Sequence, residues 1–213
     1  NQDLNLNSLN LRSTGGSNND ITLGGNVTTV TSSSISLYGS DSELTISGNL
    51  NAGTSNYIYS DGNNNDITIT GDATAGTNNY IRTWSNGYNS DISIGGDLTA
   101  SNGYLDVQSY RSGITTGGDI TATSGDITLQ THTGSQDITL GGNVSTTDNL
   151  TLSSVGDINT NGSDASIISD SNGTNTGTLS ITGAINTNNN NLTLQAPELD
   201  LNSNINAGTG SVT

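Results

Sequence analysis

A repeat of about 22 residues runs through the chain and constrains its fold more than any other feature. Three short series recur at this spacing and are interleaved. The first is an acidic or equivalent residue followed by an aliphatic-Thr/Ser-aliphatic phrase, and its copies begin at Asp20, Glu43, Asp66, Asp91, Gly113, Asp137 and Thr178. The second sets a polar residue before a small aliphatic one, and its copies begin at Asn26, Asn49, Asp72, Asp97, Asp119, Asn143, Asp157, Ala184 and Asn204. The third is an aliphatic position carried by Ile35, Ile58, Ile81, Leu105, Ile127, Leu150, Ile167 and Leu192.

Each repeat predicts three short strands. Aliphatic residues alternate with Thr, Ser or Asn, and Gly or Asn separates the runs. Apolar residues do not recur at helical spacing, which argues against helices. Equivalent strands of successive repeats can pair in parallel and in register. The sequence therefore predicts an all-β fold, a right-handed parallel β-helix (solenoid) of about nine three-strand coils of ~22 residues, as one domain over residues 1–213.

Two other architectures compete with this prediction. Antiparallel pairing would give a barrel or sandwich, but the Asx-Gly pairs typical of two-residue hairpins fall in the variable gaps between the series. The composition, with 29% hydrophobic residues and a formal net charge of −16, is also typical of disorder. A solenoid escapes this objection because each coil buries only a few inward side chains against its neighbours.

The charge also narrows the function. Arg12, Arg82 and Arg111 are the only basic residues apart from one histidine, against 19 acids, which disfavours nucleic-acid binding. No apolar run is long enough to span a membrane, so we expect no membrane insertion. The lone histidine, His132, is expected to point outward beside its neighbours in adjacent coils. Without a cluster of catalytic groups, the chain is predicted not to be an enzyme.

Several phrases resemble a known family. "GDITLQT", "LGGNVSTTDNLTLSS" and "LSITGAINTNNNNLTLQAPELDLNSNINAG" are similar to the shaft repeats of filamentous-haemagglutinin-like adhesins, the exoproteins of two-partner secretion. The resemblance covers nearly the whole chain. It implies a right-handed β-helical shaft, export to the bacterial cell surface or medium, and a role in adhesion or aggregation. The Asn-Pro-Asn signature of the family's secretion module is absent, so we expect shaft rather than secretion module.

Aromatic residues gather in the middle of the chain. Tyr57, Tyr80 and Tyr104 are predicted to occupy one equivalent outward position in three consecutive coils. Such a cluster suits a glycan or a protein partner, and it would equally serve as a stacked ladder that stabilises the sheet. The full set of candidate ligand-binding residues is Tyr57, Tyr59, Tyr80, Arg82, Trp84, Tyr104, Tyr110 and Arg111, with Tyr88 nearby.

Two acid ladders are expected from the repeat. The first acid ladder is Glu43, Asp66 and Asp91, and the second is Asp72, Asp97 and Asp119. Stacked carboxylates repel one another unless they are protonated, screened or bridged, and Ca²⁺ prefers oxygen ligands. No cofactor is otherwise expected. Two interpretations of the stacked carboxylates therefore stay open: they form a Ca²⁺ site, or they are solvated carboxylates beside turns.

The preferred function is a structural shaft segment of a secreted or surface adhesin or extracellular fibre. The alternatives are a binding module that uses the aromatic face and a subunit that self-assembles end to end. Both ends of the sequence follow the repeat. We therefore expect either continuation into a longer rod or end-to-end association.

Overall fold

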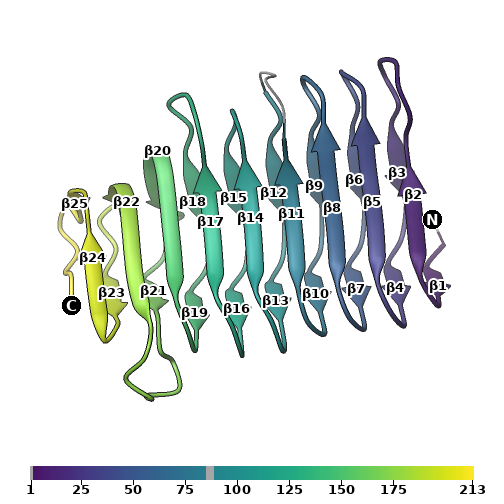
Figure 1. Ribbon diagram of the computed structural model, residues 1–213. Coiled ribbons are helices and arrows are strands. Elements are labelled where there is room, and N and C mark those ends of the chain that lie inside the picture. The colour runs from purple at the N-terminus through teal and green to yellow at the C-terminus, as the bar shows by residue number, and fades with distance from the viewer. Residues whose placement is uncertain (1, 85–88) are drawn as a thin grey trace.

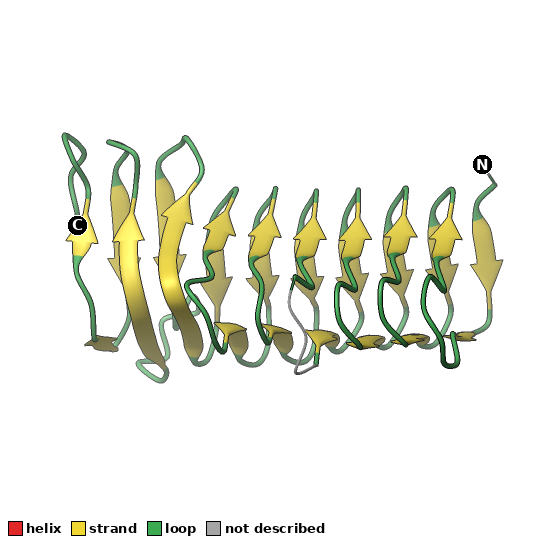
Figure 2. Ribbon diagram, turned by 90° about the horizontal axis from the view of Figure 1, so that it is seen from above, coloured by secondary structure: helices red, strands yellow, loops and turns green. Residues whose placement is uncertain are grey.

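The computed structural model describes residues 2–84 and 89–213, which form a parallel β-solenoid (Figure 1). The coils stack along one axis, and the two ends of the chain lie at opposite ends of the rod (Figure 2). Equivalent strands of successive coils pair in parallel at a spacing of about 23 residues. The described residues contain no helix, and hence none that could cross a membrane. The predicted parallel β-helix is confirmed.

Three faces make up each coil. Face 1 is a nine-stranded sheet of β1 (Leu4–Leu6), β4 (Val27–Thr29), β7 (Leu50–Ala52), β10 (Ala73–Ala75), β13 (Leu98–Ala100), β16 (Ile120–Ala122), β19 (Val144–Thr146), β21 (Ala165–Ile168) and β23 (Leu192–Gln195). Face 2 contains β2 (Leu9–Arg12), β5 (Ser33–Tyr38), β8 (Asn56–Asp61), β11 (Asn79–Thr83), β14 (Leu105–Ser109), β17 (Ile127–Thr131), the first parts of β20 (Leu150–Thr160) and β22 (Thr178–Asn186), and β24 (Glu198–Leu201).

Face 3 continues from face 2 around one edge. It contains β3 (Ile21–Leu23), β6 (Leu44–Ile46), β9 (Ile67–Ile69), β12 (Ile92–Ile94), β15 (Ile114–Thr116), β18 (Ile138–Leu140), the second parts of β20 and β22, and β25 (Ile205–Asn206). Because β20 and β22 run from face 2 into face 3 without a break, the two faces form one 16-stranded sheet.

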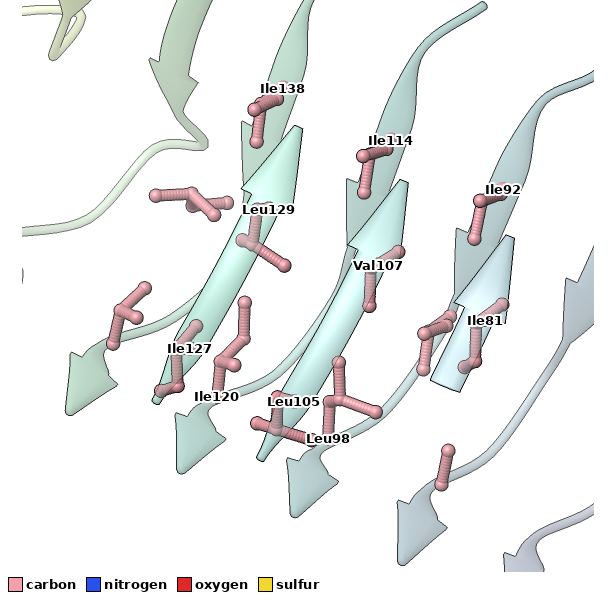
Figure 3. Close-up of a cluster of buried hydrophobic side chains, with 14 of the residues drawn as sticks. Ile81, Ile92, Leu98, Leu105, Val107, Ile114, Ile120, Ile127, Leu129 and Ile138 are labelled. Carbon is pink, nitrogen blue, oxygen red and sulfur yellow. The ribbon is translucent and has the colours of Figure 1, made fainter. Parts of the chain in front are cut away.

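Files of identical or similar aliphatic residues fill the interior. Ile81, Val107 and Leu129 occupy equivalent positions on face 2, and all three are fully buried (Figure 3). Facing them, Ile92 and Ile114 pair on face 3 in the same way. Burying one such side chain contributes about 1.5–3 kcal/mol relative to leaving it exposed. The alternation of burial along each strand explains how a chain with few hydrophobic residues fills a core.

The register of one coil differs from the sequence prediction. Val107, not Leu105, pairs with Ile81, and Leu105 pairs with Asn79. The turns between Ile81 and Val107 carry additional residues. The usual repeat length, counted from Ile81, therefore ends near Leu105, two positions before the true partner Val107. Inward positions recur at every second residue, and Leu105 is therefore still buried. The prediction was right about burial and wrong about the partner.

The three series also change faces near the C-terminal end. The copies at Asp157, Ala184 and Asn204 lead into face 3 rather than face 1. The copy at Thr178 lies on face 2, whereas Ile167 and Leu192 lie on face 1. β20 passes directly from face 2 to face 3, without the loop that separates these faces in earlier coils, and carries on face 3 a phrase like those that lead into face 1 elsewhere. Face 1 itself keeps the repeat, since Ile167 pairs with Val144, 23 residues earlier.

Candidate functional site

A chain of side-chain hydrogen bonds runs along the corner before face 1. We call it the Asx ladder; its members are Asp3, Asn26, Asn49, Asp72, Asp97, Asp119 and Asn143. In each step the Oδ1 atom accepts a hydrogen bond from the backbone N–H of the equivalent residue in the next coil, over 2.7–3.0 Å. The last step, from Asn143 to the N–H of Ser166, measures 2.9 Å. Each oxygen thus satisfies a backbone donor at a coil corner, where the strand ladder is interrupted.

Glycine precedes most members of the Asx ladder for a steric reason. A Cβ atom on Gly71, Gly96 or Gly118 would overlap the Oδ1 atom of the ladder residue in the preceding coil. The two residues of a Gly-Asx pair therefore act together. The glycine leaves room for the Oδ1 atom of the preceding coil, and that atom accepts the backbone N–H of the Asx residue. From the sequence alone, these glycines indicate only that one strand ends and the next begins.

The predicted metal candidates belong to these corner ladders. Asp72, Asp97 and Asp119 are consecutive members of the Asx ladder, so the second acid ladder is stacked as predicted. Each oxygen that bonds the next coil is committed to a backbone donor. Among the described residues, no three or more His, Cys, Asp or Glu side chains converge in an arrangement that could hold a metal ion. Ca²⁺ binding stays a prediction.

The first acid ladder also stacks, before face 3, but only its Asp66 to Asp91 step repeats the hydrogen bond of the Asx ladder, since the Glu43 carboxylate accepts from Thr45 Oγ1 instead. Asp66 Oδ1 accepts the backbone N–H of Asp91 at 3.0 Å, and the backbone N–H of Glu43 donates to Asp20 at 3.0 Å. Burial raises the pKa of Asp66, and the charges of Asp91 and Glu43 raise it further, against the opposing effect of the hydrogen bond from Asp91. The stacked carboxylates therefore repel one another within a structural ladder.

The aromatic side chains lie on the outside of face 2. The Tyr57 and Tyr80 rings occupy paired positions, with centroids 6.2 Å apart. Tyr59 contacts Tyr38 of the preceding coil, with ring centroids 6.0 Å apart. The Arg82 guanidinium carbon lies 4.3 Å from the centroid of the Tyr80 ring. These contacts fit the expected stacked ladder and leave much of the surface accessible, since Tyr57 is 41% exposed.

Tyr104 does not belong to this ladder, and the prediction that it did is wrong. The residue paired with Tyr80 is Asp106, whose carboxylate forms an ion pair with Arg82. Tyr104 lies in the turn before β14, where its backbone N–H donates to Asn78 Oδ1 at 3.0 Å. The cause is the same shift in register that moved Leu105. Tyr88 lies outside the described residues.

A second aromatic file lies at the far edge of face 2. Trp84, Tyr110 and His132 directly follow β11, β14 and β17, and we call this file the edge strip. Its ring centroids are 5.9 Å and 5.7 Å apart in succession. Of these three, His132 was not proposed as a binding residue. Its position one repeat after Tyr110 is the signal that could have placed it there.

A polar network connects the edge strip to the middle of face 2. Gln108 Nε2 donates to Asp106 Oδ1 at 2.7 Å, and Gln108 Oε1 lies 3.0 Å from His132 Nε2. In this arrangement His132 donates from Nε2, which leaves Nδ1 of the neutral ring as an acceptor. Burial lowers the pKa of His132, and the positive charge of Arg82 lowers it further.

The surface carries two hollows, and one of them borders the edge strip. One has a volume of about 320 Å³ and is lined by Arg111, Thr133, Gly134 and Gln136. Thr133 Oγ1 donates to the backbone carbonyl of Tyr110 at 2.7 Å, so this hollow adjoins the edge strip. The other, of about 240 Å³, lies near the C-terminal end and is lined by Asn159, Asn186, Asn188, Asn189, Asn206 and Gly208.

Comparison with known proteins found no match. The chain was compared with models of protein families, with curated proteins and with solved structures, and none of the three searches matched it. The resemblance to the shaft repeats of filamentous-haemagglutinin-like adhesins therefore stays a prediction from the phrases themselves.

Proposed function

We propose that this chain is a structural, non-catalytic shaft segment of a bacterial cell-surface or secreted adhesin or extracellular fibre. The observation that carries the proposal is the unbroken succession of coils, joined by strand pairing on all three faces and by side-chain ladders at the corners. The surface location and the adhesin context rest on the resemblance of the repeat phrases to that family.

Rigidity and length are the properties that such a shaft supplies. The nine strands of face 1, at about 4.8 Å each, correspond to a rod roughly 40 Å long. Each coil contacts only its neighbours, so length can change by whole coils without changing the core. A protein built in this way holds whatever lies at one end at a fixed distance from the other end.

A surface-display experiment tests the proposal. The chain is placed between an outer-membrane anchor and a small receptor-binding domain, and binding of cells to receptor-coated beads is measured. Binding should fall when two central coils are deleted and recover when they are restored. If a flexible Gly/Ser linker with the same number of residues supports equal binding, rigid spacing is not the function.

A second candidate, a subunit that self-assembles end to end, is supported by the terminal coils. Leu6 in the first coil and Leu199, Leu201 and Val212 near the other end are 36–48% exposed, unlike their buried equivalents in the middle of the rod. Strand edges at both ends also offer backbone groups for further pairing. The measurement that separates the two candidates is the dependence of rod length on concentration.

A further inference from the structure

The repeat itself shows which outward residues face 2 requires for folding. At the two central outward positions, coils outside the aromatic region carry non-aromatic polar side chains: Ser34, Ser36, Thr128, Gln130, Thr151 and Ser153, with Asn10 and Arg12 in the first coil. The strands that carry them pair as regularly as the aromatic strands do. The rings of Tyr57 and Tyr80 are therefore not required for the strand pairing of face 2. Trp84 follows β11 at the edge, where the equivalent residue of the preceding coil is Asp61, so a ring is not required there either.

The edge strip combines ring surface with access from solvent. Trp84 is 50% exposed, the largest exposed fraction among the aromatic side chains identified as exposed. The rings of Trp84, Tyr110 and His132 follow the rod axis at nearly even spacing, with planes tilted by 37° and 31° between neighbours. A linear ligand whose units repeat along the axis would meet one ring in each of three coils.

Polar groups border the rings on both sides. On the sheet side lies the network of Asp106, Gln108 and His132, which fixes the tautomer of the imidazole. On the turn side, the hollow of about 320 Å³ presents Arg111, Thr133 and Gln136. Rings flanked by amide, hydroxyl and guanidinium groups match the surface of a sugar, which has apolar C–H faces and hydroxyl edges.

Charge distinguishes among the ligands that such a strip could bind. The chain carries a net charge of −16, so a polyanion would be repelled. Its three arginines all lie on face 2 or in the turn that follows it, so the positive charge of the chain lies near the edge strip. A polycation would therefore bind the carboxylates at the corners rather than the edge strip. A protein partner would be expected to meet several exposed aliphatic side chains, whereas among the described residues from 58 to 198 Val155 is the one large aliphatic side chain that is exposed. An uncharged polymer fits this surface best.

We propose that the edge strip, Trp84, Tyr110 and His132, together with the hollow beside Arg111 and Gln136, binds an uncharged glycan chain aligned with the rod axis. This activity goes beyond the shaft function and does not depend on it. The rings supply stacking surface, and His132 Nδ1, Gln136 and Thr133 supply hydrogen bonds to sugar hydroxyls.

Affinity gel electrophoresis tests this proposal on the intact chain. The gels contain hydroxyethylcellulose, xyloglucan, galactomannan or dextran as neutral probes, and alginate or heparin as anionic probes. We expect at least one neutral polymer to retard the chain and neither anionic polymer to do so. Replacing both Trp84 and Tyr110 by alanine should weaken the retardation at least about tenfold, as for interface hot spots.

The matched control removes two aromatic rings from the same face outside the edge strip. Tyr57→Ser with Tyr80→Thr installs the residues that equivalent coils carry at these positions, Ser34 and Thr128, and should leave retardation unchanged. Thermal unfolding monitors the fold of each variant. Since Trp84 is the only tryptophan, its emission in the unmodified chain should also change with the retarding polymer, even if the double alanine variant does not fold.

Three results would overturn the proposal. The first is no retardation, and no change in tryptophan emission, with any neutral polymer. The second is equal retardation of the unmodified chain and a folded Trp84→Ala, Tyr110→Ala variant. The third is retardation by anionic polymers alone, or its loss in the Tyr57→Ser, Tyr80→Thr control.

Discussion

At the scale of single residues, the Gly-Asx pair explains why Gly followed by Asn or Asp recurs at the corner before face 1. Asp72 Oδ1 holds the backbone N–H of Asp97 at 2.9 Å, and Gly96 leaves space for that oxygen. Asn and Asp alternate freely in the ladder because only the Oδ1 acceptor is used in this bond. The acidity of the chain is in part a by-product of this choice.

Replacing Gly96 with alanine should destabilise the chain by about 2 kcal/mol or more, because the new methyl group must displace Asp72 Oδ1 and break its bond to Asp97. Chemical denaturation measures the effect. Gly113→Ala serves as the control, since its Cβ would meet its nearest neighbour, Asp137 O, at 3.2 Å and needs only a small adjustment. Equal losses for both variants would contradict the role assigned to the pair.

Replacing Asp66 with asparagine should stabilise the chain at pH 7. The folded state raises the pKa of Asp66 above the ordinary value of 3.8, so ionisation makes folding less favourable as the pH rises through and above 3.8. Asparagine keeps an Oδ1 acceptor for Asp91 and removes the repulsion from Asp91 and Glu43. Melting temperatures between pH 3 and pH 8 should show a gain that disappears at the acidic end.

Asp164→Asn provides a control of opposite sign. Hydrogen bonds from Asn191 lower the pKa of Asp164, so its charged form favours folding above pH 3.8 and this contribution is lost as the pH falls. The variant should therefore not gain stability at pH 7. A gain of the same size in both variants would mean that general charge reduction, rather than the local ladder, is responsible.

At the scale of strands, inward side chains of adjacent coils pack on one another, so each contributes to the stability of its neighbour's coil. Ile58 and Ile81 are paired and fully buried. Changing both to asparagine should disrupt the middle of the rod, because each buried amide without a partner costs roughly 1–3 kcal/mol. Equilibrium denaturation should show a lower midpoint.

The control for this pair changes the adjacent outward residues, Tyr57→Asn with Tyr80→Asn. These side chains lie on the other side of the same two strands, so the midpoint should fall much less. If the inward and outward pairs lower it equally, the core does not depend on the Ile58 and Ile81 file.

Strand existence and burial could be predicted from the sequence, whereas neighbours could be predicted only in the regular coils. Ile35, Ile58 and Ile81 pair as expected, because their intervening turns keep one length. Leu105 and Tyr104 were misplaced by longer turns. Turn length decides which residues meet and leaves almost no signal in the alternation of side chains, so the contact of Trp84 with Tyr110 could not be predicted, whereas the regular step from Tyr110 to His132 could.

At the scale of the whole molecule, the two ends differ from the middle. Leu6 and Leu199 are exposed in the terminal coils, whereas the central files are buried. We expect the isolated chain to associate end to end, with scattering showing a particle length that grows with concentration. Hydrogen exchange should show protection that rises toward the central coils. A monomer of constant length with uniformly protected ends would contradict this.

The corner ladders also give the rod a direction. In the Asx ladder, the earlier coil always supplies the acceptor and the later coil the N–H, as from Asp97 to Asp119 at 2.8 Å. At the corner before face 3 both orders occur: Asp66 Oδ1 accepts from the N–H of Asp91 in the later coil, whereas the N–H of Ser42 donates to Asn65 Oδ1 of the later coil at 2.9 Å. A chain emerging N-terminus first would therefore find, on each finished coil, both an acceptor and a donor ready for the next. We therefore expect that the coils can fold in chain order, each one pairing with the coil before it.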